Sequence, residues 1–212
     1  MIKLRLGLYK RLRVLNTYMN FFIFRLKDNL LGFDVANQFI QRVDKNSIQF
    51  ILKKYGATIG KNCDIETGLI FHNNKDYANL IIGNNCHIGK NCFFDLRDKV
   101  VIQNNCVVSM QVTFITHTEM EQSKLCNLYP PSRGKIKIED NVYIGANSII
   151  LMNISIGESS FVASGSLVNR DIEKETMWGG VPAKKIKQLR YIEGPDATDH
   201  GRGNRPPVDK SQ

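Results

Sequence analysis

Aliphatic side chains recur every six residues along most of this chain, and this period limits the possible folds more than any other feature. The repeat runs in three frames: Ile59 and Ile65; then Ile82, Ile88, Phe94, Ile102, Val108 and Phe114; then Ile138, Ile144, Ile150, Ile156, Val162 and Val168. A period of six fits neither an α-helix nor a single amphipathic strand. It predicts a solenoid of short strands in which each aliphatic side chain points inwards.

The residues between the aliphatic positions favour the same fold. Gly and Asn dominate the turns, as in 83–85 and 103–105, and they tolerate left-handed backbone angles. A small or apolar residue stands four positions after the aliphatic one, and this slot holds Cys63, Cys86, Cys92 and Cys106. We interpret these cysteines as small hydrophobic side chains inside the turns. Their spacing contains no CxxC pair, so a zinc or redox motif is not expected.

The formal net charge of +9 is concentrated at the N-terminus. Residues 1–55 contain 11 Lys and Arg against 3 Asp and Glu, whereas residues 56–212 contain 18 against 17. The body of the protein is therefore nearly neutral, which removes the main argument for a nucleic-acid partner.

Residues 1–55 also carry the pattern of a basic amphipathic helix. Its apolar residues follow three- and four-residue steps: Leu4, Leu8, Leu12, Leu15, Met19, Phe22 and Leu26. Lys and Arg lie between them, with no acid before Asp28. Two interpretations stay open. In the first, which we favour, the helix packs on the solenoid or on a neighbouring subunit. In the second, it contacts an anionic membrane surface peripherally.

The cellular location is predicted from what the sequence lacks. No apolar run approaches the ~20 residues of a membrane-spanning helix, and no signal-peptide pattern is recognised. Five cysteines without a secretory context are expected to be reduced thiols. We therefore expect a cytoplasmic protein. Residues 191–212, rich in Pro, Gly, Asp and Arg, are expected to form a disordered tail.

Two segments interrupt the repeat. The first, 71–79, contains His72, and the second, 117–135, contains Tyr129 followed by two prolines. Proline has no N–H to donate to a central strand, so the second segment is expected to be a projecting loop. Such loops commonly carry functional residues.

Over roughly residues 56–190 the sequence resembles the hexapeptide-repeat acyltransferases. The six-residue repeat carries the resemblance, together with the Gly-Val-Pro-Ala-Lys sequence at 180–184. The resemblance implies a mainly β fold, a left-handed parallel β-helix with three hexapeptides per coil. A short helical segment, 1–55, would precede it and a C-terminal cap would follow. It also implies a homotrimer with active sites between subunits.

His117 is the candidate catalytic base. It follows the strand 112–116 at the start of the long loop, and histidine suits proton transfer near neutral pH. In sugar O-acetyltransferases of the galactoside and maltose type, which this region resembles, a histidine in this place is the base. A coil similar to 138–145 follows it there, with Trp usual where this chain has Tyr143.

Asp95 precedes His117 by about one coil, so stacking is expected to bring the two residues together. Asp95 would then orient the imidazole, and the resemblance places an acid that binds the acceptor at or near this position. The alternative is a turn residue paired with Arg97. Glu119 and Glu121 are weaker candidates for orienting His117.

Two other histidines are considered. His72 is the second candidate base, because the segment before it resembles serine acetyltransferases, whose catalytic histidine sits in an early turn. His87 occupies an outward slot of the repeat, at the surface or a subunit interface. From a neighbouring chain it could line the substrate cleft.

The resemblance also implies a site for acetyl-CoA in the last coils. Small residues would line its groove and cations would hold its phosphates. The matching positions are Ala146, Ser164, Asn169, Arg170, Lys184 and Lys187. For the lysines, the alternative is a solvated face. Trp178 is expected to cap the open end of the coil.

The sequence therefore predicts an acetyl-CoA-dependent O-acetyltransferase in polysaccharide biosynthesis. It would act on a saccharide hydroxyl by direct transfer, with His117 as base. The alternatives are an N-acetyltransferase on an amino sugar or nucleotide sugar, an enzyme resembling serine O-acetyltransferase, and a non-catalytic scaffold.

A metal enzyme and a cysteine enzyme fit the sequence less well. Zinc enzymes resembling γ-class carbonic anhydrases need three histidines that converge on one metal, two of them a few residues apart. The nearest pair here, His72 and His87, is 15 residues apart, and no second histidine accompanies His117, so no metal is expected. Cys126 is the one cysteine outside the repeat slot, and no histidine close in sequence pairs with it.

Overall fold

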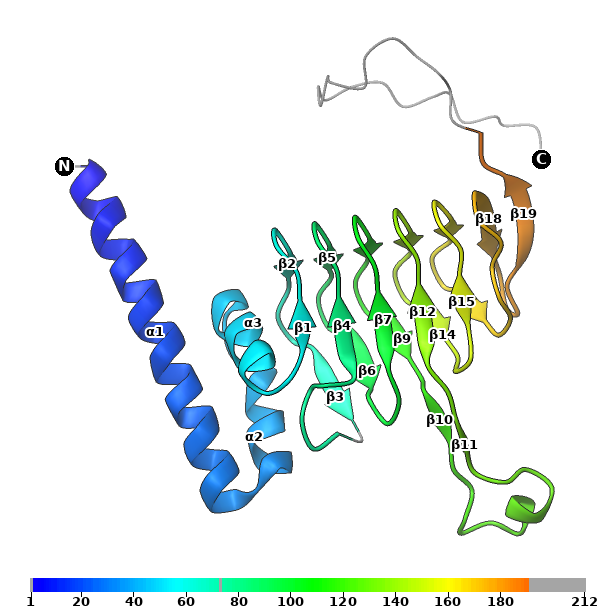
Figure 1. Cartoon of the computed structure of the whole chain (residues 1–212), viewed down its shortest axis with the longest axis horizontal. Helices are drawn as coiled ribbons and strands as arrows, with labels where there is room; N and C mark the ends of the chain where they lie inside the picture. Colours follow the sequence, from blue (N-terminus) through cyan, green and yellow to red (C-terminus); the bar gives the residue numbers. More distant parts are fainter. Residues whose placement is uncertain (1, 73, 191–212) are drawn as a thin grey trace.

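The computed structural model describes residues 2–72 and 74–190, with side chains from residue 11 onwards. Three helices precede a parallel β-helix whose coils stack in one direction along the molecule (Figure 1). The helices are α1 (Ile2–Leu31), α2 (Phe33–Ile40) and α3 (Lys45–Lys54). The predicted 191–212 tail lies outside the described residues.

Strands from successive coils form three parallel faces. The first face contains β1 (Thr58–Ile59), β4 (Leu80–Ile82), β7 (Val100–Ile102), β12 (Ile136–Ile138) and β15 (Ser155–Ile156). The second contains β2 (Asp64–Ile65), β5 (His87–Ile88), β8 (Val107–Val108), β13 (Tyr143–Ile144), β16 (Phe161–Val162) and β18 (Thr176–Gly179). The third contains β3 (Ile70–His72), β6 (Phe93–Asp95), β9 (Thr113–Phe114), β14 (Ile149–Ile150) and β17 (Leu167–Val168). The predicted parallel β-helix is confirmed.

The six-residue repeat forms the core of this β-helix. Its aliphatic and aromatic residues from Ile65 to Val168 are buried. On the third face Phe71, Phe94 and Phe114 stack in a column, with ring centroids 5.6 and 4.9 Å apart. Cys86, Cys92 and Cys106 are buried inside the turns, as the repeat slot predicts, whereas Cys63 in the first coil is only half-buried. Stacking every coil in the same register places equivalent residues of successive coils beside one another.

Asparagine ladders hold the turns in line. Asn62, Asn85, Asn105 and Asn141 adopt positive φ angles of 56–60°, a region that asparagine tolerates better than most residues. Their side-chain amides bond from coil to coil at 3.0–3.2 Å. The turns therefore keep one geometry along this edge of the β-helix.

The second interruption of the repeat is an antiparallel hairpin. Strands β10 (His117–Thr118) and β11 (Ser132–Arg133) pair between β9 and β12, and a short 3-10 helix, η1 (Lys124–Asn127), lies in the loop beyond them. The hairpin projects from the stacked coils (Figure 1). At the base of the hairpin, β7 and β12 pair in register, so the coil stack continues without a break.

A second antiparallel pair closes the C-terminal end. Strand β19 (Lys184–Gln188) folds back on β18, and Trp178 in β18 is 8% exposed beside Val162 of the preceding coil. Trp178 thus lies over the end of the core, as expected for a cap.

The N-terminal helix packs differently from the interpretation that we favoured for its apolar stripe. The side of α1 that contacts the protein carries Phe21 and Phe24, whose rings lie 5.2 Å from Phe50 and 4.7 Å from Tyr55. The stripe residues Leu12, Leu15, Met19, Phe22 and Leu26 are 45–61% exposed. Packing of this stripe on the protein's own β-helix is therefore wrong for the described residues.

Candidate active site

Asp95 and His117 meet where the third face ends. Asp95 is the last residue of β6, and His117 follows β9 in the next coil, at the base of the hairpin. Their side chains join through His117 Nδ1 and Asp95 Oδ2, 2.5 Å apart. The predicted proximity of these two residues is confirmed, and it results from the stacking of one coil on the next.

The Asp95 carboxylate is buried and held by several donors. Asp95 as a whole residue is only 1% exposed to solvent. Besides His117, Oδ2 accepts from the backbone N–H of Thr116 at 2.8 Å and from the Thr116 hydroxyl at 2.9 Å. Burial alone would raise the pKa of Asp95, but the hydrogen bonds from His117 and Thr116 outweigh it, and the net pKa is lowered. Asp95 is therefore ionised at neutral pH.

An ionised Asp95 fixes the proton on one nitrogen of His117. A carboxylate only accepts hydrogen bonds, so Nδ1 of a neutral His117 must donate to it. The lone pair then lies on Nε2, the nitrogen that can take a proton from another molecule. The His117 side chain is 18% exposed, so solvent or a ligand reaches it.

Arg97 contacts Asp95 through its backbone and the hairpin through its side chain. Its backbone N–H approaches Asp95 Oδ1 at 3.3 Å, while its guanidinium pairs with Glu119 at the start of the loop. Glu119 is thus engaged by Arg97. Thr116, which sequence reasoning missed, completes the support of Asp95. Its place directly before His117 was the available signal.

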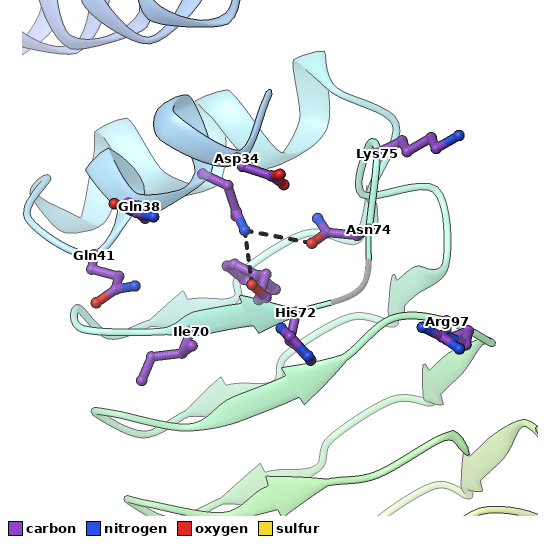
Figure 2. A pocket seen from close by; sticks show the side chains of 10 residues that line it. Asp34, Gln38, Gln41, Ile70, His72, Asn74, Lys75 and Arg97 are labelled. Carbon is purple, nitrogen blue, oxygen red and sulfur yellow. Dashed lines mark hydrogen bonds between the residues drawn. The ribbon is translucent and has the colours of Figure 1, made fainter. Parts of the chain in front are cut away.

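A polar groove of about 700 Å³ opens beside this pair, between α2 and β3. Asp34 and Gln38 of α2 line one side, and His72 and Arg97 line the other (Figure 2). Asn37 of α2 is also a lining residue. Asn37 Nδ2 donates to the backbone oxygen of Phe71 at 2.8 Å, which holds the helix against the coil. Sequence reasoning missed the α2 residues, because nothing in the repeat shows where the helices pack.

The groove and the Asp95–His117 pair are connected through neighbouring strands. His72 is the register partner of Asp95 in the adjacent strand. Arg97 lines the groove and also a smaller hollow of about 230 Å³ with Thr118 and Arg133 of the hairpin. Arg97 therefore connects the groove to the hollow at the base of the hairpin, next to His117 in the sequence.

His72 and His87 differ in their surroundings. His72 is exposed at the groove, with its ring 6.0 Å from that of Phe93. His87 lies on the second face, where Nδ1 is 3.1 Å from Asp64 Oδ2, and its side chain is 39% exposed. Neither has a buried carboxylate partner comparable to Asp95 among the described contacts.

The residues expected to bind acetyl-CoA gather in the last coils, at two corners and on the cap. Ala146 and Ser164 lie in stacked turns between the second and third faces, where the Gly165 N–H donates to the Ala146 oxygen at 2.8 Å. Asn169 and Arg170 are exposed after β17, at the corner that also carries His117 two coils earlier. Lys184 and Lys187 are exposed on β19. Small residues and exposed cations are thus present, as the co-substrate requires.

Metal chemistry finds no support in the described part of the chain. Among residues 2–72 and 74–190, no three His, Cys, Asp or Glu side chains converge where they could hold a metal ion.

The fold and the repeat define a class of protein. The family described as "Hexapeptide repeat of succinyl-transferase" matches residues 79–110 and 135–170. Together with the three-faced β-helix, this match makes the chain similar to hexapeptide-repeat acyltransferases.

Relatives specify the class further. The chain is 26% identical over 176 residues to galactoside O-acetyltransferase of Escherichia coli (strain K12), covering 78% of this chain and 79% of that one. A galactoside acetyltransferase in complex with coenzyme A superposes with a TM-score of 0.61 at 25% identity, covering 68% and 71%. A hexapeptide-repeat acetyltransferase of Vibrio cholerae O1 biovar eltor, complexed with acetyl-coenzyme A, shares the fold at 21% identity, with a TM-score of 0.59 and coverage of 82% and 88%. The chain is thus similar to acetyltransferases over most of its length, and two of these similar structures hold coenzyme A or acetyl-coenzyme A.

Proposed function

We propose that this protein transfers an acetyl group from acetyl-CoA to a hydroxyl group of a saccharide. The observation that carries the proposal is the bond between His117 and the buried, ionised Asp95. It supplies a general base with a defined proton position, one coil away from the strand pair that connects it to the polar groove. The similarity to galactoside O-acetyltransferase supports a sugar as acceptor.

In the proposed mechanism His117 Nε2 removes the proton from the acceptor hydroxyl. The oxygen then attacks the thioester carbonyl carbon and forms a tetrahedral intermediate. Its collapse breaks the carbon–sulfur bond, and the imidazolium returns the proton to the departing thiolate. Asp95 keeps its negative charge throughout and stabilises the imidazolium. No acyl-enzyme forms, and Cys126 takes no part.

The groove between α2 and β3 is the proposed acceptor site. Its lining carries several side-chain amides, among them Asn37 and Gln38, and the carboxylate of Asp34. Such groups donate to and accept from sugar hydroxyls. Asp95 is too buried to serve as a broad sugar-binding surface, so we assign it mainly to orienting His117; its direct contact with the acceptor stays a prediction.

The co-substrate is proposed to lie along the last coils. Ala146 and Ser164 leave room for the pantetheine arm, and Asn169 bonds to its amides. Arg170, Lys184 and Lys187 supply positive charge for the phosphates. Because the fold leaves its outer faces exposed, we also propose the expected homotrimer, with His87 at or near a subunit boundary. A role in polysaccharide biosynthesis and a cytoplasmic location stay predictions.

One experiment tests the function directly. Purified protein is incubated with acetyl-CoA and a panel of sugars, amino sugars, nucleotide sugars and serine, while thiol release and the acetylated product are measured. We expect turnover with a hydroxyl acceptor and an ester product that alkali removes. An alkali-stable amide product identifies the N-acetyltransferase instead. Tight binding of coenzyme A without turnover on any acceptor favours the scaffold.

A further inference from the structure

The N-terminal helix α1 carries two apolar faces on opposite sides. One face packs on the protein, with Phe24 fully buried and Asn20 Nδ2 donating to Ser47 Oγ at 3.0 Å. The other is formed by residues at three- and four-residue steps, all exposed: Leu12, Leu15, Met19, Phe22, Leu26 and Leu30. At about 100° per residue, this outer stripe is centred on the side of α1 opposite Phe24.

The outer stripe is long and strongly exposed. Leu15 and Phe22 are each 61% exposed and Leu30 is 71% exposed. From Leu12 to Leu30 the stripe extends about 27 Å along the helix axis. The helix stands at the end of the molecule, and its outer side faces away from the stacked coils (Figure 1). A soluble surface rarely exposes an apolar strip of this size without a function.

Positive charge borders the outer stripe. Arg11 precedes Leu15 by one helical turn and Arg25 follows Phe22 by less than one turn, so both lie along the same edge. Lys3, Arg5 and Lys10 continue the basic character in the sequence, and the first acid of the helix is Asp28. An apolar strip with basic flanks and aromatic residues matches a helix lying in the headgroup region of an anionic membrane.

A second copy of α1 fits this stripe less well. An antiparallel pair of helices packed stripe to stripe would bring their arginine edges close together, and α1 offers no acid before Asp28 to compensate the charge. Anionic headgroups supply that compensation, at about 1 kcal/mol per Lys or Arg near the surface, which is about fivefold in affinity. The helix would lie on the membrane and not across it, since no helix in the described residues is long and apolar enough to span one.

We propose that the outer stripe of α1 docks the protein on an anionic membrane surface. Leu15 and Phe22 enter the boundary between headgroups and acyl chains, while Arg11 and Arg25 contact lipid phosphates. The contact leaves the inner face of α1 packed on α2 and α3, so docking needs no rearrangement of the fold. It brings the acetyltransferase to a surface where membrane-attached acceptors are concentrated.

The test is co-sedimentation of the full chain with vesicles of phosphatidylcholine, alone or mixed with phosphatidylglycerol. We expect binding to the mixed vesicles only, weakened by salt. The Leu15→Gln/Phe22→Gln double variant should bind at least about tenfold more weakly, and Arg11→Gln/Arg25→Gln about 25-fold more weakly. Met110→Gln, which removes an exposed apolar side chain from a β-helix turn, is the matched control and should bind as the wild type does.

Other outcomes overturn the proposal. One such outcome is that the wild type binds neither kind of vesicle. Another is binding that neither double variant weakens. Light scattering without lipid tests whether a second copy of the chain covers the stripe instead. If Leu15→Gln/Phe22→Gln reduces the oligomeric mass and the wild type does not bind vesicles, the stripe is an interface between copies. Thermal melting checks that each variant is folded. If the leucine–phenylalanine variant does not fold, the arginine variant alone decides. None of these readouts depends on catalytic activity.

Discussion

His117 Nδ1 lies 2.5 Å from Asp95 Oδ2, although the two residues are 22 positions apart in the sequence. The stacking of one coil on the next creates this contact, and the hairpin that begins at His117 keeps the imidazole partly open to solvent. A buried carboxylate with a lowered pKa thus binds one nitrogen of the ring and leaves the other nitrogen, Nε2, able to accept a proton.

Replacing the base should reduce turnover far more than binding. His117→Ala is expected to lower kcat by about 10²–10⁴-fold, because the acceptor hydroxyl loses its proton acceptor. Steady-state kinetics with the acceptor found in the panel measures this loss, and calorimetry should show unchanged coenzyme A binding. His72→Ala is the matched control; a larger loss in that variant would transfer the role of base to His72.

Replacing Asp95 should change the tautomer of His117. In Asp95→Asn the side chain can donate to Nδ1, so Nε2 carries the proton and loses its lone pair. We expect kcat to fall by about 10–10⁴-fold. Nitrogen NMR of the imidazole reads the tautomer directly, as proton on Nδ1 in the wild type and on Nε2 in the variant. Identical histidine spectra in the two proteins would remove the orienting role.

Acid should destabilise the wild type partly through Asp95. The pKa of this carboxyl is lowered in the folded protein, so its stabilising effect is complete above the unfolded pKa of about 3.9 and is lost as the pH falls through the lower folded pKa. Melting temperatures measured between about pH 7 and pH 3 should therefore converge for the wild type and Asp95→Asn at the acid end. Curves that stay parallel throughout would contradict this linkage.

Gly145 should tolerate no side chain. A Cβ there would lie 2.4 Å from the backbone nitrogen of Ser164 in the next coil, so neighbouring turns would have to move apart. Gly145→Ala is expected to reduce the free energy of unfolding by about 1–3 kcal/mol. At Gly165, with φ of +71°, an added Cβ meets no atom within 4 Å, and Gly165→Ala should suffer only backbone strain. Urea titration of both variants measures the difference; equal losses would show that contact with Ser164 is unimportant.

The sequence was sufficient for the β-helix and for the proximity of Asp95 and His117 because both depend on the repeat. A period of six places Phe94 beside Phe114, and the same stacking brings Asp95 to the residues after the next strand. The buried cysteines follow from the same register. Each of these inferences needs only the distance along the chain between equivalent positions.

Features outside the repeat were harder to predict. The α2 side of the groove depends on how a helix packs across the first coil, and no period encodes the contact between Asn37 and Phe71. The orientation of α1 was also missed, since the helix is apolar on two sides and periodicity alone does not tell which side is buried. Thr116 was overlooked because its hydroxyl bonds to Asp95 inside the protein. The alternation of inward and outward side chains does not predict this orientation for a residue where the strand gives way to a loop.

The hairpin between β9 and β12 has a consequence for how such an enzyme acquires new acceptors. Its base is closed by pairing of His117 with Arg133, and the Gly134 N–H donates to the Thr116 oxygen at 2.9 Å, directly beside the catalytic pair. Everything beyond that closure hangs outside the coil register. Residues 120–131 can thus be lengthened, shortened or exchanged while the Asp95–His117 pair at the root of the hairpin and the ion pair of Arg97 with Glu119 stay in place.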